Sequence, residues 1–338
     1  MVIVTDGMRW QEVFAGADSA LLNREYGKVE DTAQIRREFW RPTAEERRQA
    51  LFPFLWGEVA RAGQIYGNLR LGDTATVTNG LKFSYPGYNE MLTGHPDPRI
   101  NSNSAGPNPN RTVFEWLASQ PGFRDSVAAL ATWDEFGDIF NRERAGFPVR
   151  AAWEPPFPDN PSPAEAMLNR VYTTTMRYWG DVAYDGFLAA AVDDYVATRK
   201  PRLLFVGYGE TDEWAHMGRY DRYLEAAHAV DGFIADLWRR MQATPEYRGN
   251  TTFLILTDHG RGATPADWDD HGQDVTGAEY IWFAALGPDT PALGERGAGT
   301  GTITQSQLAA TVAALLGKNW PAADTAAAPP IAGVIGRH

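Results

Sequence analysis

Four short apolar runs, each followed by polar residues or glycine, constrain the fold of this 338-residue chain more than any other feature. Their β-branched, aromatic and leucine residues, bounded by turn-forming residues, are typical of buried strands. Longer stretches between the runs have the apolar spacing of helices. This alternation predicts a doubly wound α/β fold, a mostly parallel sheet with helices on both faces. The predicted strands are 2–5, 203–206, 253–257 and 280–286, and the predicted helices are 111–120, 184–199, 220–242 and 305–316.

No clear boundary divides the sequence, so we expect a single domain over residues 1–338. Two segments, 96–110 and 146–166, are rich in proline, asparagine, glycine or serine and are predicted to be loops. Both exceed the usual connection length, and long loops in compact enzymes commonly bind or cover a substrate. We therefore expect residues 96–180 to include long loops and an inserted cap region.

Composition narrows the chemistry that the chain can perform. Thirty-one Lys and Arg against 43 Asp and Glu give a net charge of −12, so binding to a nucleic-acid polymer is not expected. The absence of cysteine excludes thiolate metal sites and cysteine nucleophiles, and any metal must be held by His, Asp, Glu or hydroxyl oxygen. No apolar stretch approaches the ~18 residues of a membrane span, and the first residues do not resemble an export signal.

Carboxylate and imidazole side chains gather near the ends of the predicted strands. Asp212 and His216 are four residues apart, which places both on one face of a helical turn. Each group taken alone is better explained by capping or surface hydrogen bonding. Together, at the edge where parallel sheets bind ligands, they predict a metal site. The set comprises Asp6 after the first strand, Asp212 and His216 after the second, Asp258 and His259 after the third, and His271 before the fourth.

Ser84 precedes Pro86, a residue suited to the first turn of a helix, and residues 88–93 continue as a plausible helix. Ser84 would then lie at a helix N-terminus, where the dipole and the free amides favour an oxyanion. The alternative is an ordinary capping serine. The metal-type clusters elsewhere in the chain favour the first interpretation.

These motifs together resemble the alkaline phosphatase superfamily, especially its nucleotide pyrophosphatase/phosphodiesterase branch. Ser84 matches the position of the family nucleophile, and Thr93-Gly94 follows it at the family's spacing. The Asp-x-x-x-His pair, the Asp-His-Gly sequence from Asp258 and the His-Gly sequence from His271 match in order. The resemblance spans nearly the whole chain and implies a doubly wound α/β core.

The resemblance also implies two divalent metal ions beside the nucleophile, most often zinc, with manganese as an alternative. All the implied ligands are nitrogen or oxygen donors, which zinc accepts. One ion would be held by Asp6, Asp258, His259 and the Ser84 oxygen, and the other by Asp212, His216 and His271.

The implied activity is hydrolysis of a small phosphorylated substrate, a phosphodiester or a nucleotide-type pyrophosphate, through a phosphoseryl intermediate. Two alternatives stay open: a phosphomonoesterase of the same superfamily, and a non-catalytic metal-containing protein that binds anions. Tyr88 stands where formylglycine sulfatases have an arginine, which disfavours a sulfatase. The habits of relatives suggest a periplasmic or secreted protein.

Asn103 is the expected partner of a phosphoryl oxygen, because it aligns with an asparagine that the diesterase branch uses in this way. Asn101 and Asn89 are rival positions for this role. Lys82 and Arg9 lie near the motifs in the sequence and are further candidate substrate contacts.

Overall fold

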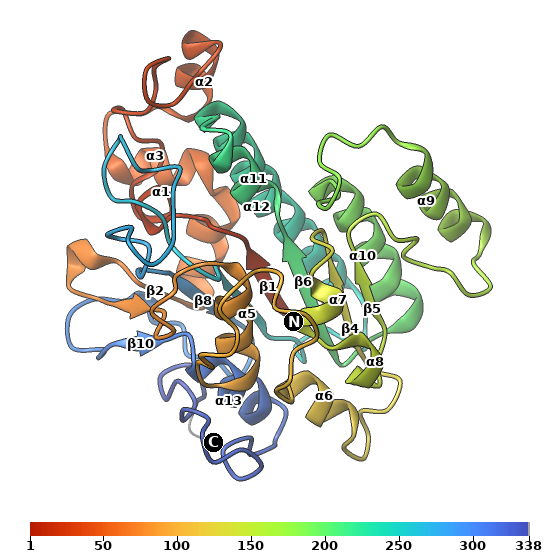
Figure 1. Cartoon of the computed structure of the whole chain (residues 1–338). Helices are drawn as coiled ribbons and strands as arrows, with labels where there is room; N and C mark the ends of the chain where they lie inside the picture. The colour runs from red at the N-terminus through yellow and green to blue at the C-terminus, as the bar shows by residue number, and fades with distance from the viewer. Residues whose placement is uncertain (337–338) are drawn as a thin grey trace.

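The computed structural model describes residues 1–336, and its centre is an eight-stranded sheet (Figure 1). β1 (Val2–Thr5) lies in the interior of the sheet and pairs in parallel with both β6 (Leu203–Tyr208) and β7 (Phe253–Leu256). The strand order is β5-β4-β6-β1-β7-β8-β2-β9. The other strands are β4 (Val127–Ala131), β5 (Val149–Ala151), β8 (Phe283–Leu286), β2 (Gln64–Tyr66) and β9 (Gly294–Glu295), and a second sheet pairs β3 (Ala75–Thr76) with β10 (Ile303–Thr304).

The direction of β8 decides which loops meet at the carboxyl-terminal ends of the parallel strands, which we call one edge of the sheet. β8 pairs antiparallel with β7 and with β2, whereas the other pairings between these eight strands are parallel. Phe283, the first residue of β8, is the partner of Leu256, the last residue of β7. The start of β8 and the ends of β1, β6 and β7 therefore share one edge.

Alternate residues of β1 face two hydrophobic cores, one on each side of the sheet. Ile3 packs into the first core and Val2 and Val4 into the second, and all three are buried. Neighbouring strands contribute to both cores and helices cover them on each side, so the predicted doubly wound α/β fold is confirmed. The first core is covered by α1 (Trp10–Ala15), α2 (Thr32–Phe39), α3 (Ala44–Leu51), α10 (Asp185–Arg199) and α12 (Tyr220–Ala243), and the second by α5 (Ser84–Thr93), α6 (Val113–Ala118) and α13 (Gln307–Leu315).

The structure contains more strands and helices than the sequence patterns predicted, and it also differs from one predicted loop. Segment 146–166 is not a continuous loop, because it contains β5 and the start of α9 (Pro163–Thr174), which opens with a capping box between Ser162 and Glu165. β4 was not predicted, because its short Ala-rich sequence lacks a β-branched pattern. Segment 96–110 contains no helix or strand, as predicted.

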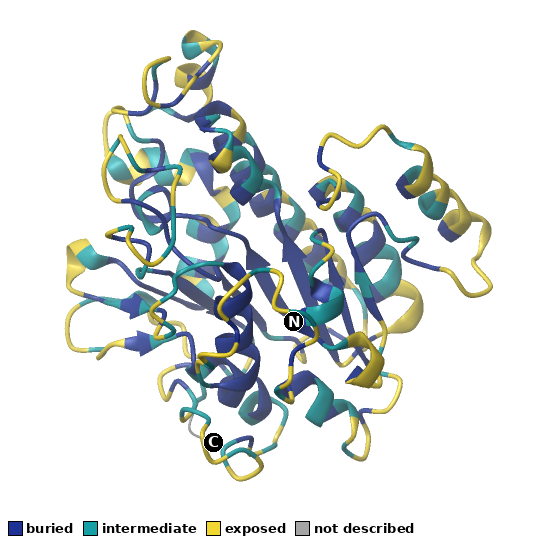
Figure 2. Ribbon diagram, viewed as in Figure 1, coloured by how far each residue is buried: buried dark blue, intermediate teal, exposed yellow. Residues whose placement is uncertain are grey.

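Burial separates the sheet from its surroundings. The strands are buried along most of their length, whereas exposed residues concentrate on loops and on α9 (Figure 2). Among residues 1–336, none of the helices combines the length and the apolarity that crossing a bilayer requires.

Glu90 fastens α5 to its neighbours. This fully buried carboxylate accepts hydrogen bonds from the backbone N–H groups of Thr78, Asn79 and Ser306, at 2.9–3.1 Å. It also accepts bonds from the hydroxyls of Thr78 and Ser306, at 2.8 and 2.7 Å. One side chain of α5 thus holds the loop before the helix and the segment before α13, and this fixes the position of Ser84 at the start of α5.

Glu90→Gln should lower the free energy of unfolding by about 1–3 kcal/mol, because the new amide points a donor at groups that also donate. Urea denaturation measures this loss. Glu25→Gln, at an exposed glutamate, is the matched control and should change stability by less than about 0.5 kcal/mol. Equal stability of the two variants would contradict the anchoring role of Glu90.

Candidate metal centre

The sheet edge defined above gathers the predicted metal ligands. Asp6 follows β1, Asp258 and His259 follow β7, and α11 (Glu210–His216) begins two residues after β6. His271 lies in the loop that leads to the start of β8, which is antiparallel and therefore begins at the same edge. The topology brings all of these segments together, as ligand sites in α/β sheets require.

Ser84 lies in the first of two groups of donors. Its Oγ is 3.3 Å from Nε2 of His259 and 3.5 Å from Oδ1 of Asp6. The same His259 nitrogen is 3.4 Å from Asp6 Oδ1 and 3.5 Å from Oδ2 of Asp258. Four donor atoms from β1, α5 and β7 thus converge on one small volume.

The second group contains Asp212, His216 and His271. Asp212 and His216 lie one turn apart on α11, with Oδ2 and Nε2 separated by 3.0 Å, as their spacing predicted. The Nε2 atoms of His216 and His271 are 3.0 Å apart. His259 adjoins both groups, because its Nε2 is 3.8 Å from Asp212 Oδ1 and its ring stacks on that of His271, with centroids 4.0 Å apart.

The burial and the negative charge of the carboxylates in these two groups suit the binding of a cation. Burial, together with the charges of Asp258 and Asp212, raises the pKa of Asp6 to about 8. Burial, with a further contribution from Asp212, raises the pKa of Asp258 to about 7. Asp258 is fully buried, and its Oδ2 has no hydrogen-bond partner among the described residues. Since an unpaired buried carboxylate oxygen is costly, these residues suit divalent ions that neutralise them.

The histidines are suited to the same purpose. Burial and the neighbouring His259 lower the pKa of His271 far below its usual value, which keeps its imidazole neutral and able to bind a metal. Donor atoms form two sets, and within each set all the atoms lie within 4.8 Å of one another. One set comes from Asp6, Asp258 and His259, and the other from Asp212, His259 and His271.

Two residues that the sequence did not assign to the site contact the predicted ligands. The Tyr88 hydroxyl donates a 2.8 Å hydrogen bond to Asp6 Oδ2, and the buried Arg261 guanidinium binds Asp212. Tyr88 is one helical turn after Ser84, and Arg261 is two residues after His259. This proximity in sequence was the available signal, but it did not reveal the directions of the side chains.

Of the five predicted substrate contacts, only Asn103 lines the cavity beside Ser84. Its Oδ1 accepts a 3.0 Å hydrogen bond from the backbone N–H of Tyr85, in the first turn of α5. Asn101 is exposed and does not line this cavity.

The other three predicted contacts are engaged elsewhere. Asn89 is fully buried and accepts hydrogen bonds from the amides of Asn108 and Asn110, so it orders the loop after α5. Arg9 is buried against Glu12, with 3.2 Å between Nε and Oε2. The ammonium of Lys82 donates to the carbonyl of Val275 at 3.0 Å, and only its backbone carbonyl approaches His271. The geometry therefore does not support substrate contacts by these side chains.

A cavity of about 330 Å³ opens beside the two donor groups and is bounded by Ser84, Asn103, Asp6, Asp212 and His216. Its outer wall is acidic, and the described residues that line it include no Lys or Arg. The side chains of this outer wall are Trp133, Asp134, Glu135, Asp181 and Glu213.

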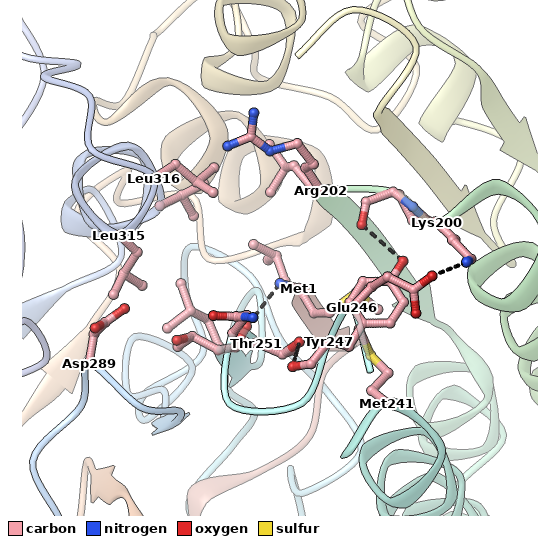
Figure 3. A pocket seen from close by; sticks show the side chains of 17 residues that line it. Met1, Lys200, Arg202, Met241, Glu246, Tyr247, Thr251, Asp289, Leu315 and Leu316 are labelled. Carbon is pink, nitrogen blue, oxygen red and sulfur yellow. Dashed lines mark hydrogen bonds and ion pairs between the residues drawn. The ribbon is translucent and has the colours of Figure 1, made fainter. Parts of the chain in front are cut away.

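A larger cavity, of about 630 Å³, lies at the opposite edge of the sheet, at the start of β1 (Figure 3). Its walls include Lys200, Arg202 and Glu246, and the Met1 amino group donates to the carbonyl of Thr252. None of the predicted metal ligands lines it. We therefore assign the candidate centre to the smaller cavity.

The fold has counterparts among solved structures. The chain superposes on the lipoteichoic acid synthase LtaP from Listeria monocytogenes with a TM-score of 0.56 and 12% identity, covering 94% of this chain and 72% of that one. The phosphonate monoester hydrolase from Silicibacter pomeroyi superposes with a TM-score of 0.58 and 13% identity, covering 98% of this chain and 75% of that one. Murine ectonucleotide pyrophosphatase/phosphodiesterase 5 superposes with a TM-score of 0.52 and 10% identity, covering 94% of this chain and 95% of that one. At these identities the likeness shows the fold alone.

The sequence comparison is more specific. No curated protein matches the chain. Residues 22–280 match the family described as type I phosphodiesterase / nucleotide pyrophosphatase, whose members are hydrolases that depend on divalent metals. The match covers most of the chain and agrees with the resemblance drawn from the motifs. The chain therefore belongs to the type I phosphodiesterase / nucleotide pyrophosphatase family of the alkaline phosphatase superfamily.

Proposed function

We propose that this protein is a metal-dependent phosphodiesterase that uses Ser84 as its nucleophile. The observation that carries the proposal is the position of the Ser84 hydroxyl. It lies at the N-terminus of a ten-residue helix, within 3.5 Å of donor atoms of Asp6 and His259, and at the wall of an open cavity. Ser84 is the first residue of α5, and its hydroxyl faces these two side chains, whereas a serine that merely capped the helix would turn toward the helix amides.

Two ions fit the donors. Asp6, Asp258, His259 and Ser84 would hold one, and Asp212, His216 and His271 the other. The nitrogen and oxygen donors favour zinc, and manganese is the alternative. When bound, such ions polarise phosphoryl oxygens and lower the pKa of a coordinated hydroxyl or water.

The chain itself supplies the nucleophile and the oxyanion donors. Ser84 Oγ forms a bond to phosphorus and gives up its proton to solvent, while the bond from phosphorus to the oxygen of the leaving alcohol breaks; Ser84 is then esterified to a phosphoryl group that keeps the second ester substituent. Water then hydrolyses this seryl ester and returns the hydroxyl. The two N–H groups of the Asn103 amide nitrogen are the donors that would hold a non-bridging oxygen. The bond from Tyr85 N–H to Asn103 Oδ1 orients that amide and leaves its Nδ2 to donate.

The outer wall of the cavity favours a diester over more highly charged substrates. Four acidic residues line this cavity beside Ser84: Asp134, Glu135, Asp181 and Glu213. Burial and the charge of Asp212 raise the pKa of Glu213 to about 7, so this wall becomes more negative above neutral pH. A monoester or a pyrophosphate would bring additional negative charge with no Lys or Arg on the described wall to receive it. A diester with a neutral or positively charged leaving group avoids that repulsion.

Ser84→Ala should lower kcat for an aryl phosphodiester by about 10³-fold or more, because the variant has no atom that can form the phosphoenzyme. A chromogenic assay measures the rate, and mass spectrometry after acid quench should find a peptide in which Ser84 carries the phosphoryl group with its remaining ester substituent, in the wild type only. Ser119→Ala, at an exposed serine ending α6, is the control and should retain full activity. A Ser84→Ala variant with wild-type turnover would refute the assignment of the nucleophile.

Methyl 4-nitrophenyl phosphate should be hydrolysed with a kcat/KM about tenfold or more above that of 4-nitrophenyl phosphate. The physical reason is that an additional uncompensated charge beside the acidic wall costs on the order of 1 kcal/mol or more. Steady-state kinetics with both compounds, which share one leaving group, isolates the effect of this charge. A preference for the monoester would instead support a phosphomonoesterase.

Zinc affinity should rise steeply between about pH 6 and about pH 8.5, because ligand protons compete with the ion. With pKa values near 8 and 7, Asp6 and Asp258 hold protons at the lower pH and lose them at the higher pH. Competition with a chromophoric chelator measures the affinity, and proton release on binding should be largest near neutral pH. Asp258→Asn removes one of these protons and should flatten the pH dependence; an unchanged profile in this variant would count against Asp258 as a ligand.

A further inference from the structure

Arg261 is almost fully buried, with 1% of its surface exposed, and its guanidinium is bound on every side. Nε donates to the Gly7 carbonyl at 3.1 Å, and Nη1 donates to the Asp269 carbonyl at 2.5 Å. Nη2 donates to the Asp212 carbonyl at 3.2 Å and also binds the Asp212 carboxylate oxygen Oδ1. All three guanidinium nitrogens are therefore engaged.

The partners of Arg261 belong to the segments that carry the donors. Gly7 follows Asp6, Asp212 is itself a donor, and Asp269 is two residues before His271. Arg261 is in turn two residues after His259. One planar cation thus ties together the end of β1, the helix α11 and the two arms of the loop between β7 and β8. No other described side chain is shown to join all of these segments.

The local backbone is shaped to admit the guanidinium. Gly7 has φ +57°, and a Cβ there would lie 2.9 Å from both Nε and Nη2 of Arg261 and 2.5 Å from Asp212 Oδ1. Since real Cβ atoms do not approach that closely, any other residue at position 7 would displace the contact. The absence of a side chain at Gly7 is thus a second feature, besides the hydrogen bonds, that allows Arg261 to occupy this place.

Arg261 also fixes the position of Asp212, because its Nη2 donates to the carbonyl of that residue and binds its carboxylate oxygen Oδ1. Three backbone carbonyls hold the guanidinium in place. A metal ion can therefore bind next to Arg261 without displacing it.

We infer that Arg261 is a positioning residue of the metal centre: it holds the Asp212 side chain in one orientation and fixes the spacing between the segments that supply the ligands. The inference rests on the metal centre proposed above. Partners of this kind orient metal ligands, and their loss commonly weakens metal binding by about 10–100-fold. Lysine keeps the charge but lacks the planar fork, so it cannot reach the same three carbonyls.

The test compares Arg261→Lys with Arg9→Lys. Arg9 is also almost fully buried, with 2% exposed, and it pairs with Glu12 instead of a predicted ligand. Each protein is stripped with a chelator and titrated with Zn²⁺ and with Co²⁺, which reports ligand geometry through its visible absorption. Thermal melting of the stripped proteins separates loss of stability from loss of binding. The wild-type titration tests the metal centre itself, independently of Arg261.

We expect Arg261→Lys to bind Zn²⁺ about tenfold or more weakly than the wild type and to change the Co²⁺ spectrum. Arg9→Lys should lose stability while keeping the wild-type affinity and spectrum. Three results would overturn the inference: unchanged binding in Arg261→Lys, equal losses of affinity in both variants, or tighter binding in Arg261→Lys, which would mean that the guanidinium competes with the metal. If Arg261→Lys does not fold, Arg261→Gln replaces it with the same expected and contrary results.

Discussion

The concentration of buried negative charge at one edge of the sheet governs the rest of this structure. Asp258 and Asp212 both raise the pKa of Asp6, and Asp212 raises that of Asp258, one of whose oxygens has no hydrogen-bond partner among the described residues. Arg261 supplies one fixed positive charge to this group. Three buried carboxylates around one arginine leave negative charge that bound protons or further cations must balance. The proposed metal centre, and the catalytic proposal with it, depends on divalent ions taking the place of these protons.

The topology explains why these charges meet. Parallel strands deliver the residues after β1 and β7, and the helix after β6, to the same edge. The reversal of β8 brings His271 there as well, since the loop before an antiparallel strand lies where parallel strands end. α5 then places Ser84 against this edge, and Glu90 holds the helix in position from within the second core. The fold and the site thus depend on the same few connections.

What the sequence could predict was local. The strands ended by polar residues, the helix beginning at Ser84 and the single helical face shared by Asp212 and His216 follow from short-range patterns. Long-range contacts decided what could not be predicted. Asn89 was a rival of Asn103 for the phosphoryl contact, but Asn89 lies on α5 and is buried in the core, whereas the loop after α5 brings Asn103 to the cavity. The role of Arg261 depends on carbonyls from distant segments, and the acidic wall combines residues from three separate stretches of the chain.

The most direct test of this account is anomalous X-ray scattering from crystals grown with zinc, recorded on both sides of the zinc absorption edge. The account predicts two peaks: one among Asp6, Asp258, His259 and Ser84, and one among Asp212, His216 and His271. Peaks confined to other surfaces, or a zinc-soaked crystal with no peak at this edge of the sheet, would contradict it.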